Sequence, residues 1–460
     1  MKQSAKFIIT LTIFGISTHA LANDLPNLSN THFQQCLDNL KNSSAFRGIS
    51  DATFEAYRPS EPDPTVIRSL NHQPEFKKDI WDYHASLVDA ERVIAGLQAK
   101  AEQSQVLSQI YARYGVQPEH VLGVWGVESN FGTTLGGKNL FSSLATLSCF
   151  DRRQNYFRKE FANALRIVQN GDIQPQDMTG SWAGAFGQTQ FMPSTFLELA
   201  IDFDGDGRKD LVNSNADALA STANFLSKRG YRAGEPWGYE VKLNGYLGAS
   251  GRTAKKSMDY WQNQGITLPD GRPLPNNMAS AGLLLPAGIN GPAFLVGKNF
   301  DTFYSYNASE SYALAIAHLA TLIETNSTNT NFATPWPTDD PGISRREAKE
   351  IQQALMMAGY DIGNIDGIIG DNTRRAIMSY QSKVGVLPDG RAGKKFHRLI
   401  TSQINILPTN PTTPDTMPYQ VPVSKIPSTH QVATPIKSIV PKTYRRVVNA
   451  DGTISLVPSQ

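Results

Sequence analysis

Residues 118–132 have the sequence PEHVLGVWGVESNFG, and the interpretation of the rest of the chain starts from this stretch. Pro118 suits the first turn of a helix, where its missing N–H breaks no helical hydrogen bond. Val121, Val124 and Glu128 follow at helical spacing, so Glu128 shares the apolar face of its own helix. The pattern predicts a helix that carries one carboxyl group on its buried side.

A carboxyl group held among apolar side chains loses the hydration of its charged form, so the pKa of Glu128 should rise. With a raised pKa it keeps a proton near neutral pH and can donate that proton to a glycosidic oxygen. The alternative is a Glu near a helix end whose carboxylate reaches water past the apolar face, as most Glu side chains do. Residues 118–132 alone leave both interpretations open.

A second stretch, residues 180–194, has the sequence GSWAGAFGQTQFMPS. Its small residues let another backbone or a ligand approach closely. Its aromatic rings offer flat faces to sugars, and Ser181, Gln188 and Gln190 offer hydrogen bonds to hydroxyl and acetamido groups. A tight crossing of two helices would use the same small residues. This stretch alone therefore indicates either a sugar-binding segment or a helix–helix contact.

Together, the two stretches resemble the lytic murein transglycosylases of the membrane-bound lytic transglycosylase B family. The similarity covers about residues 31–325 and implies a mainly α (α+β), lysozyme-like catalytic domain. The catalytic Glu of the family's E-S-x-x-G motif matches Glu128. The family's substrate-binding positions match, in chain order, Arg152, Arg153, Ser181, Gln190, Tyr306 and Asn307. Where the family often has a Tyr, this chain has Phe225, so one hydroxyl contact of the sugar groove is in question.

The resemblance implies cleavage without water as the nucleophile. One Glu protonates the oxygen of the β-1,4 bond between MurNAc and GlcNAc. It then accepts the proton of the muramoyl C6 hydroxyl, which closes onto C1 as a 1,6-anhydro product. The substrate's acetamido group stabilises the intermediate, and Ser181 and Asn307 orient groups near it.

Two other functions stay open. A hydrolytic muramidase could use the same fold and Glu128, but it needs a positioned second carboxylate or an activated water, and residues 180–194 contain no acid. A wall-binding scaffold without catalytic activity is the other alternative, although every position of the catalytic motifs is filled.

An acidic loop, residues 202–208, has the sequence DFDGDGR. Carboxylates at its positions 1, 3 and 5 and a Gly at position 6 match the start of an EF-hand loop. Position 12 is Asn213, and the resemblance to the transglycosylases places the last carboxylate later, at Asp217. Because carboxylates this close repel one another without a cation, we expect a structural Ca²⁺. Its expected ligands are Asp202, Asp204, Asp206, the Arg208 carbonyl and Asp217.

The N-terminus has the pattern of a secretory signal, with Lys2 and Lys6, an apolar run over 7–16 and an Ala20-Leu21-Ala22 cleavage site. A membrane anchor is the alternative, but the apolar run is short for one, and no Cys stands at the cleavage point for lipid attachment. We expect residues 1–22 to be removed after Ala22, which leaves an unanchored enzyme in the periplasm.

Removal of this leader takes two of the 43 basic residues and none of the 41 acidic ones, so the exported chain has balanced charge. It lacks the global positive field that would hold nucleic acid. The two cysteines, Cys36 and Cys149, either form a disulfide in the oxidising compartment or lie buried separately as thiols.

The catalytic region is predicted to be mainly helical. Short apolar runs between Gly, Pro and Asn predict strands and loops over residues 239–300. Residues 326–342, rich in Asn, Thr and Pro, are predicted to be a linker that buries little apolar area. A Pro-rich tail over 404–460 should be extended and mobile, apart from a hairpin over 445–457. Helical periodicity marks residues 32–40, 91–114, 118–128, 155–170, 216–227 and 312–324.

Residues 343–403 resemble the small three-helix peptidoglycan-binding domain. The sequence IDGIIGDNTRRA at 365–376 is close to that family's D-G-x-x-G-x-x-T-x-x-A core. A capping box formed by Ser344 and Glu347 should open its first helix. Such a module would hold the enzyme on peptidoglycan strands and raise the local substrate concentration. A generic helical bundle is the alternative.

Overall fold

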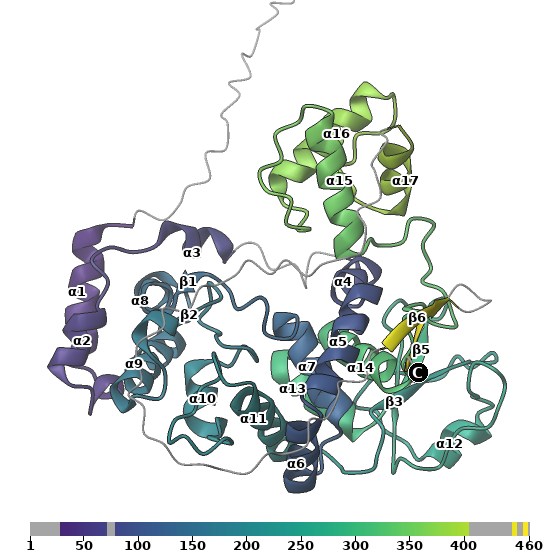
Figure 1. Ribbon diagram of the computed structural model, residues 1–460, viewed down its shortest axis with the longest axis horizontal. Coiled ribbons are helices and arrows are strands. Elements are labelled where there is room, and N and C mark those ends of the chain that lie inside the picture. Colours follow the sequence, from purple (N-terminus) through teal and green to yellow (C-terminus); the bar gives the residue numbers. More distant parts are fainter. Residues whose placement is uncertain (1–27, 71–78, 404–443, 449–453, 459–460) are drawn as a thin grey trace, which may run out of the picture.

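The computed structural model describes residues 28–70, 79–403, 444–448 and 454–458. The predicted leader and most of the predicted tail lie outside these residues. Figure 1 shows a large, mainly helical domain and a smaller three-helix domain that stands above α4 (Ile80–Leu87). Within the described part of the chain, every helix is too short or too polar to cross a bilayer.

Two helices form the centre of the large domain, α7 (Pro118–Ser129) and α14 (Glu310–Glu324), with α5 (Ala90–Glu102) beside them. Glycines on α7 allow α14 to approach closely. A Cβ at Gly123 would lie 2.8 Å from the Ile316 carbonyl oxygen, and one at Gly126 would lie 2.7 Å from Leu319 Cδ2. The close packing holds α7 and α14 together, and Tyr312 in the first turn of α14 reaches Glu128.

The N-terminal half packs around two further helices, α8 (Leu140–Phe150) and α9 (Gln154–Asn170). Against them lie α1 (Asn30–Lys41), η1 (Ser44–Phe46), α2 (Asp51–Tyr57) and α3 (Pro64–Ser69). A disulfide between Cys36 and Cys149 joins α1 to the end of α8, which decides between the two states that the sequence allowed. A disulfide typically stabilises a fold by about 2–4 kcal/mol.

Five of the six predicted helices of this domain are present, including α11 (Asn215–Lys228), but one prediction was wrong. The single helix predicted over 91–114 is two helices, α5 and α6 (Ser104–Tyr114), because the backbone of Gln103 leaves helical geometry at φ −96° and ψ 12°. Periodicity alone could not show this break, since both helices bury an apolar stripe on the same core.

Residues 239–300 form the predicted short strands and loops. β3 (Gly238–Val241), β5 (Ala293–Val296) and β4 (Gly282–Leu284) make an antiparallel sheet in the order β3-β5-β4. The connection from β3 to β4 contains α12 (Met258–Asn263) and closes a small core around Trp261. Directly after β5, α13 (Lys298–Asn307) leads into α14, so the sheet fixes where Tyr306 and Asn307 lie.

Shorter elements complete the large domain. β1 (Lys138–Asn139) pairs with β2 (Thr179–Gly180), which follows η3 (Pro175–Asp177). The helix α10 (Pro193–Leu199) packs on α9.

Near the C-terminus, β6 (Tyr444–Val448) pairs antiparallel with β7 (Ile454–Pro458), which confirms the predicted hairpin.

The smaller domain consists of α15 (Arg345–Met357), α16 (Asp371–Lys383) and α17 (Lys394–Gln403), as predicted. The capping box is present: the Glu347 N–H donates to Ser344 Oγ at 3.2 Å, and the Ser344 N–H donates to Glu347 Oε2 at 2.8 Å. The core of this domain is separate from that of the large domain and includes Ile351, Leu355, Ile377 and Ile400.

The segment between the domains is packed more closely than the predicted linker. The Phe332 ring stacks 4.2 Å from the His318 ring, which in turn stacks on His84, and Trp336 packs against the same group. Burial lowers the pKa of His84 to about 3, so this histidine is neutral. Two partly buried aromatic rings, Phe332 and Trp336, thus anchor this otherwise polar segment to the large domain.

Arginines of the small domain pair with acids of the large one: Arg346 Nε lies 3.3 Å from Glu91 Oε1, and Arg391 makes closer contacts. Arg391 donates from Nη1 and Nη2 to the two carboxylate oxygens of Asp82 on α4, at 2.7 and 3.0 Å. Its Nε donates to Asp340 Oδ2 at 2.7 Å. Nearby, a Cβ at Gly342 would lie 2.7 Å from the Trp81 carbonyl oxygen, so the chain passes close to α4. The fork geometry orients the small domain on the large one.

We expect Arg391→Ala to loosen this orientation without unfolding either core, because it removes a bidentate ion pair of about 1–3 kcal/mol. Small-angle scattering should show a larger radius of gyration, and limited proteolysis should cut faster near Pro341. Arg375→Ala, which removes the same charge away from the interface, is the matched control. Identical scattering curves for the two variants and the unsubstituted protein would show that Arg391 does not hold the domains together.

Candidate active site

Glu128 lies in the last turn of α7, where the chain leaves the helix through a sharp turn. Asn130, Phe131 and Gly132 all have positive φ, at 50°, 59° and 80°. This conformation is unfavourable for a bulky residue such as Phe131. The Phe131 ring is held in place by an edge contact with Trp125, at 5.6 Å between centroids, and by the open face of Gly126. Strain of this kind is typical of functional sites.

The Glu128 carboxyl group is half-buried and has one side-chain hydrogen-bond partner, Tyr312, whose hydroxyl donates to Oε1. Burial raises the pKa of Glu128 to about 7, and the Tyr312 hydrogen bond opposes this rise. Both causes are uncharged, so among the described residues no second carboxylate drives the shift. The predicted rise in the pKa of Glu128 is confirmed. The alternative, a carboxylate that reaches open water, is wrong.

Aromatic rings form one wall of the site. Tyr306 stacks on Tyr312 at 6.4 Å between centroids, and its hydroxyl donates to the Thr189 carbonyl at 2.9 Å. Phe225 packs against Tyr306 at 4.6 Å and is only 5% exposed. Phe225 therefore packs behind Tyr306 and exposes little of its own ring to a substrate. Asn307 lies exposed at the end of α13.

Residues 180–194 form a compact loop, and not the helix–helix crossing that was the alternative. Isolated bridges pair Gly180 with Phe186 and Phe186 with Phe191. A Cβ at Gly180 would lie 2.1 Å from the Ala185 carbonyl oxygen, so only glycine fits there. Ser181 Oγ accepts from the Ala185 N–H at 3.1 Å, which leaves its own proton for another acceptor.

Two glutamines fix this loop. Gln190, which has φ 49°, donates from Nε2 to the carbonyls of Gly187 at 2.8 Å and Leu135 at 3.2 Å. Gln188 is buried and accepts from Trp125 Nε1 at 2.9 Å, while its Nε2 donates to the Val212 carbonyl at 3.1 Å. Gln188 therefore ties the Glu128 helix to the loop and to the acidic segment beyond it.

The sequence identified Gln188 only as a possible sugar ligand and did not identify Tyr312 as a site residue. The sequence does not distinguish a buried structural amide, such as that of Gln188, from an amide that faces a ligand. Tyr312 opens a helix of small and aliphatic residues, SYALAIAHLATLI, and that composition signals close packing, but no spacing rule connects it to Glu128.

The arginine pair lies apart from this centre. Arg152 and Arg153 are exposed just after α8 and line a shallow cavity of about 340 Å³ together with Asp151 and Tyr156. Arg153 Nε lies 3.5 Å from Asp151 Oδ1, and its guanidinium stacks over the Phe157 ring at 5.0 Å. In the described residues, no hydrogen bond or ion pair connects either arginine to Glu128.

The acidic loop brings three of its expected ligands together. Carboxylate oxygens of Asp202, Asp204 and Asp217 lie within 4.8 Å of one another. Asp217 is fully buried and accepts from the N–H groups of Phe203 at 2.7 Å and Asp210 at 2.8 Å. Burial raises the pKa of Asp217, and these hydrogen bonds oppose the rise.

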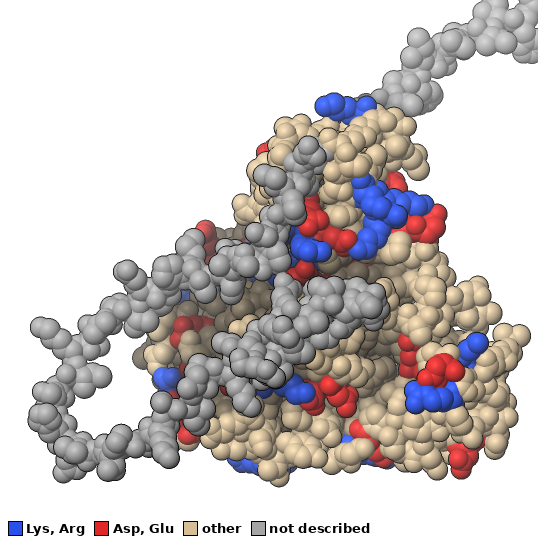
Figure 2. Space-filling model, turned by 45° about the vertical axis from the view of Figure 1, so that its right-hand side comes forward, with Lys and Arg blue, Asp and Glu red and all other residues tan. Residues whose placement is uncertain are grey.

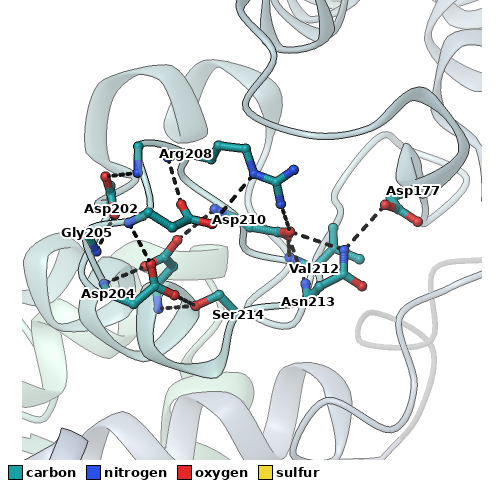
Figure 3. Close-up of polar contacts among 12 residues, drawn as sticks. Asp177, Asp202, Asp204, Gly205, Arg208, Asp210, Val212, Asn213 and Ser214 are labelled. Carbon is teal, nitrogen blue, oxygen red and sulfur yellow. Dashed lines mark hydrogen bonds and ion pairs between the residues drawn. The ribbon is translucent and has the colours of Figure 1, made fainter. Parts of the chain in front are cut away.

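Asp206, the fourth expected carboxylate, lies outside this cluster and instead accepts from the Arg208 N–H at 2.9 Å. The Arg208 guanidinium donates to Asp210 at 3.1 Å, as Figure 3 shows. Asp210, which the sequence did not single out, is buried and also accepts from the N–H groups of Val212 and Asn213. The loop is thus ordered by its own hydrogen bonds around a three-carboxylate cluster.

A carboxyl group whose burial raises its pKa to about 7, set in a mainly helical lysozyme-like domain, is typical of enzymes that cleave glycans by acid/base catalysis. Residues 32–321 match the transglycosylase SLT domain, and the chain belongs to this family. It is therefore a lytic transglycosylase. Residues 344–400 match a peptidoglycan binding domain.

Three relatives illustrate the similarity. The chain is 29% identical over 303 residues to membrane-bound lytic murein transglycosylase B of Escherichia coli K12, covering 63% of this chain and 82% of the relative. SltB3 from Pseudomonas aeruginosa, solved with NAG-anhNAM-pentapeptide, is 40% identical, with a TM-score of 0.64 over 80% of this chain and 99% of its own. The E. coli lytic transglycosylase Slt35, solved with calcium, is 29% identical, with a TM-score of 0.55 over 66% of this chain and 95% of its own.

We expect Tyr312→Phe to move the pH dependence of kcat to higher pH. Tyr312 donates to the charged form of Glu128, so loss of this hydrogen bond raises the pKa of Glu128 above its present value of about 7. Activity that needs a protonated Glu128 should then persist to higher pH before it falls. Tyr306→Phe is the control, because its hydroxyl bonds to Thr189. An equal shift in both variants, or none in Tyr312→Phe, would contradict this role.

Proposed function

We propose that the chain cleaves the β-1,4 bond between MurNAc and GlcNAc in peptidoglycan and forms a 1,6-anhydroMurNAc end, with Glu128 as the single acid and base. Glu128 carries this proposal, because its pKa of about 7 arises from burial and one tyrosine. A group with this pKa is present in both protonation states near neutral pH, as two successive proton transfers require.

In the first step, Glu128 donates its proton to the glycosidic oxygen, and the bond from that oxygen to muramoyl C1 breaks. In the second, the Glu128 carboxylate accepts the proton of the C6 hydroxyl as its oxygen bonds to C1. Glu128 ends protonated, and no water is consumed. The partial positive charge at C1 between these steps is stabilised by the substrate's acetamido group, with Ser181 and Asn307 orienting groups near it.

The other candidate residues bind or position the glycan. Ser181 retains a hydroxyl proton for a substrate oxygen, and Tyr306 presents its ring beside Glu128, supported by Phe225. Gln190 acts through the loop, because its amide nitrogen is engaged by two carbonyls. Arg152 and Arg153 contact the strand further along, away from the bond that is cleaved.

The wider setting supports the same substrate. The relative SltB3 was solved with NAG-anhNAM-pentapeptide, a fragment with an anhydro sugar. A peptidoglycan binding domain would keep the enzyme on its polymeric substrate and raise the local concentration of cleavage sites. We further propose that the chain is exported to the periplasm by its leader and acts there without a membrane anchor.

We expect Glu128→Gln to bind purified sacculi as tightly as the unsubstituted protein but to release soluble products at least about 1,000-fold more slowly, because it removes the only acid/base group. Mass analysis of the products distinguishes the chemistry. Anhydromuramoyl ends from the unsubstituted protein support transglycosylation, whereas reducing ends mean hydrolysis. Turnover by Glu128→Gln at the normal rate would dismiss the assignment of the catalytic group.

We propose that the acidic loop binds a structural Ca²⁺. Asp202, Asp204 and Asp217 fit such a cation, because their oxygens converge within 4.8 Å and carboxylate oxygens are the donors that Ca²⁺ prefers. Asp206 and the Arg208 carbonyl would complete the set by a small adjustment of the loop. The ion would balance the charge of this cluster and order the loop that Gln188 joins to the Glu128 helix. The calcium complex of Slt35 supports this proposal.

We expect Ca²⁺ to raise the thermal unfolding temperature of the chelator-treated protein, since an ion at 100 times its Kd stabilises the fold by about 2.7 kcal/mol. In Asp204→Asn this increment should be lost while the metal-free unfolding temperature stays nearly unchanged, because Asp204 is exposed. Asp259→Asn, another exposed acid, should keep the full increment. Equal increments in the two variants would count against the site.

A further inference from the structure

A cavity of about 480 Å³ lies between the two domains, in the size range of sites that bind small ligands. The large domain contributes Asp79, Arg92 and Thr134 to its walls, and the small domain contributes Arg345, Arg374 and Asp389. Figure 2 shows charged side chains gathered where the smaller domain meets the larger one. The cavity exists only because the domains are docked.

Some of the charged side chains that line the cavity are not paired within its walls. Arg391 and Asp82, which also line the cavity, neutralise each other. Arg374 is exposed on α16, and within the described residues no hydrogen bond or ion pair engages its guanidinium. Arg345 donates from Nε to the Asp366 carbonyl at 3.2 Å. Two arginines of the small domain therefore offer guanidinium groups to a ligand.

Arg92 and Arg345 also lie close to each other. Burial lowers the pKa of Arg92, and the positive charge of Arg345 lowers it further. Like charges at this range repel, and an anion between them relieves that repulsion. Asp79, whose carboxylate does not cap α4, and Asp389 add negative charge at the rim. The cavity is therefore suited to a ligand that carries carboxylates together with an ammonium group.

The cavity reaches the turn that follows Glu128. Arg92 Nε donates to Asn130 Oδ1 at 3.2 Å, and the Thr134 N–H donates to the Ser129 carbonyl at 2.9 Å. Asn130 and Ser129 are the two residues directly after Glu128. A substituent on a sugar near the cleaved bond could thus enter the cavity while the glycan itself stays at Glu128.

We propose that this interdomain cavity binds the peptide stem of a muramoyl residue near the cleaved bond. Stem carboxylates pair with Arg345 and Arg374, and a free stem ammonium group pairs with Asp79 and Asp389. The inference rests on the proposed function, because the stem reaches the cavity only when the glycan lies at Glu128. Both domains then hold one substrate unit, and strands with stems are preferred over bare strands.

The test compares two substrates, glycan strands with intact stems and the same strands stripped of their stems by an amidase. In the Arg345→Gln/Arg374→Gln double variant, kcat/KM for stem-bearing strands should fall about 10-fold, the effect of losing two partly solvated charge-assisted hydrogen bonds. The kcat/KM for bare strands should not change. Arg375→Gln/Arg398→Gln is the matched control, because it removes the same charge from exposed positions of the small domain that do not line the cavity.

A third substrate, strands whose stem carboxylates are converted to methyl esters, separates charge from shape. On it the unsubstituted protein should lose about as much kcat/KM as the Arg345→Gln/Arg374→Gln variant loses on stem-bearing strands, and that variant should show no further loss. The inference is overturned if that variant loses activity equally on stem-bearing and bare strands, if it loses none, or if the control pair has the same effect. Absence of anhydromuramoyl products from the unsubstituted protein on every strand would instead refute the proposed function.

Discussion

The fold depends on the contact that keeps the Glu128 carboxyl group out of bulk water. Gly123 and Gly126 let α14 lie directly on α7, and this approach brings the Tyr312 hydroxyl to Glu128 Oε1. Burial and the tyrosine act on the pKa of Glu128 in opposite directions, and burial prevails. A larger residue at either glycine would push α14 away from α7 and disturb the hydrogen bond from Tyr312, so backbone packing contributes to the environment of the acid.

Hydrogen bonds of Gln188 hold the segments around this contact in place. Gln188 accepts from Trp125, one turn before Glu128 on the same helix, and donates toward the segment that follows the acidic loop. The strained turn at Phe131 is held by packing against α7. Distant parts of the sequence therefore determine the position of a single side chain. An acid that gives and later recovers a proton at two different oxygens, as we propose for Glu128, needs this rigidity.

Much of the site could be predicted from sequence, for reasons that particular residues make clear. Glu128 stood out because a charged residue at an apolar helical position is a local pattern, and the acidic loop stood out because its carboxylates alternate along a few residues. Tyr312 and Gln188 could not be predicted, since their partners lie 184 and 63 positions away. The break at Gln103 and the anchoring of residues 326–342 by Phe332 were missed for a related reason, because packing decides them and average composition does not.

The net charge of the chain likewise does not reveal where charged side chains gather in the fold. The balanced total of the exported chain predicts no strong field, yet Arg92, Arg345, Arg374 and Arg391 meet around one cavity from four separate segments. Arg391 pairs with Asp82 across the domain boundary and so helps to dock the domains. The cavity that Arg92, Arg345 and Arg374 line lies beside this ion pair. A net charge cannot report such a grouping, because acids elsewhere on the surface cancel it. Only the docked arrangement brings these scattered arginines to one cavity, which reaches the turn after Glu128, and in our proposal the small domain thereby becomes part of the region that meets the substrate.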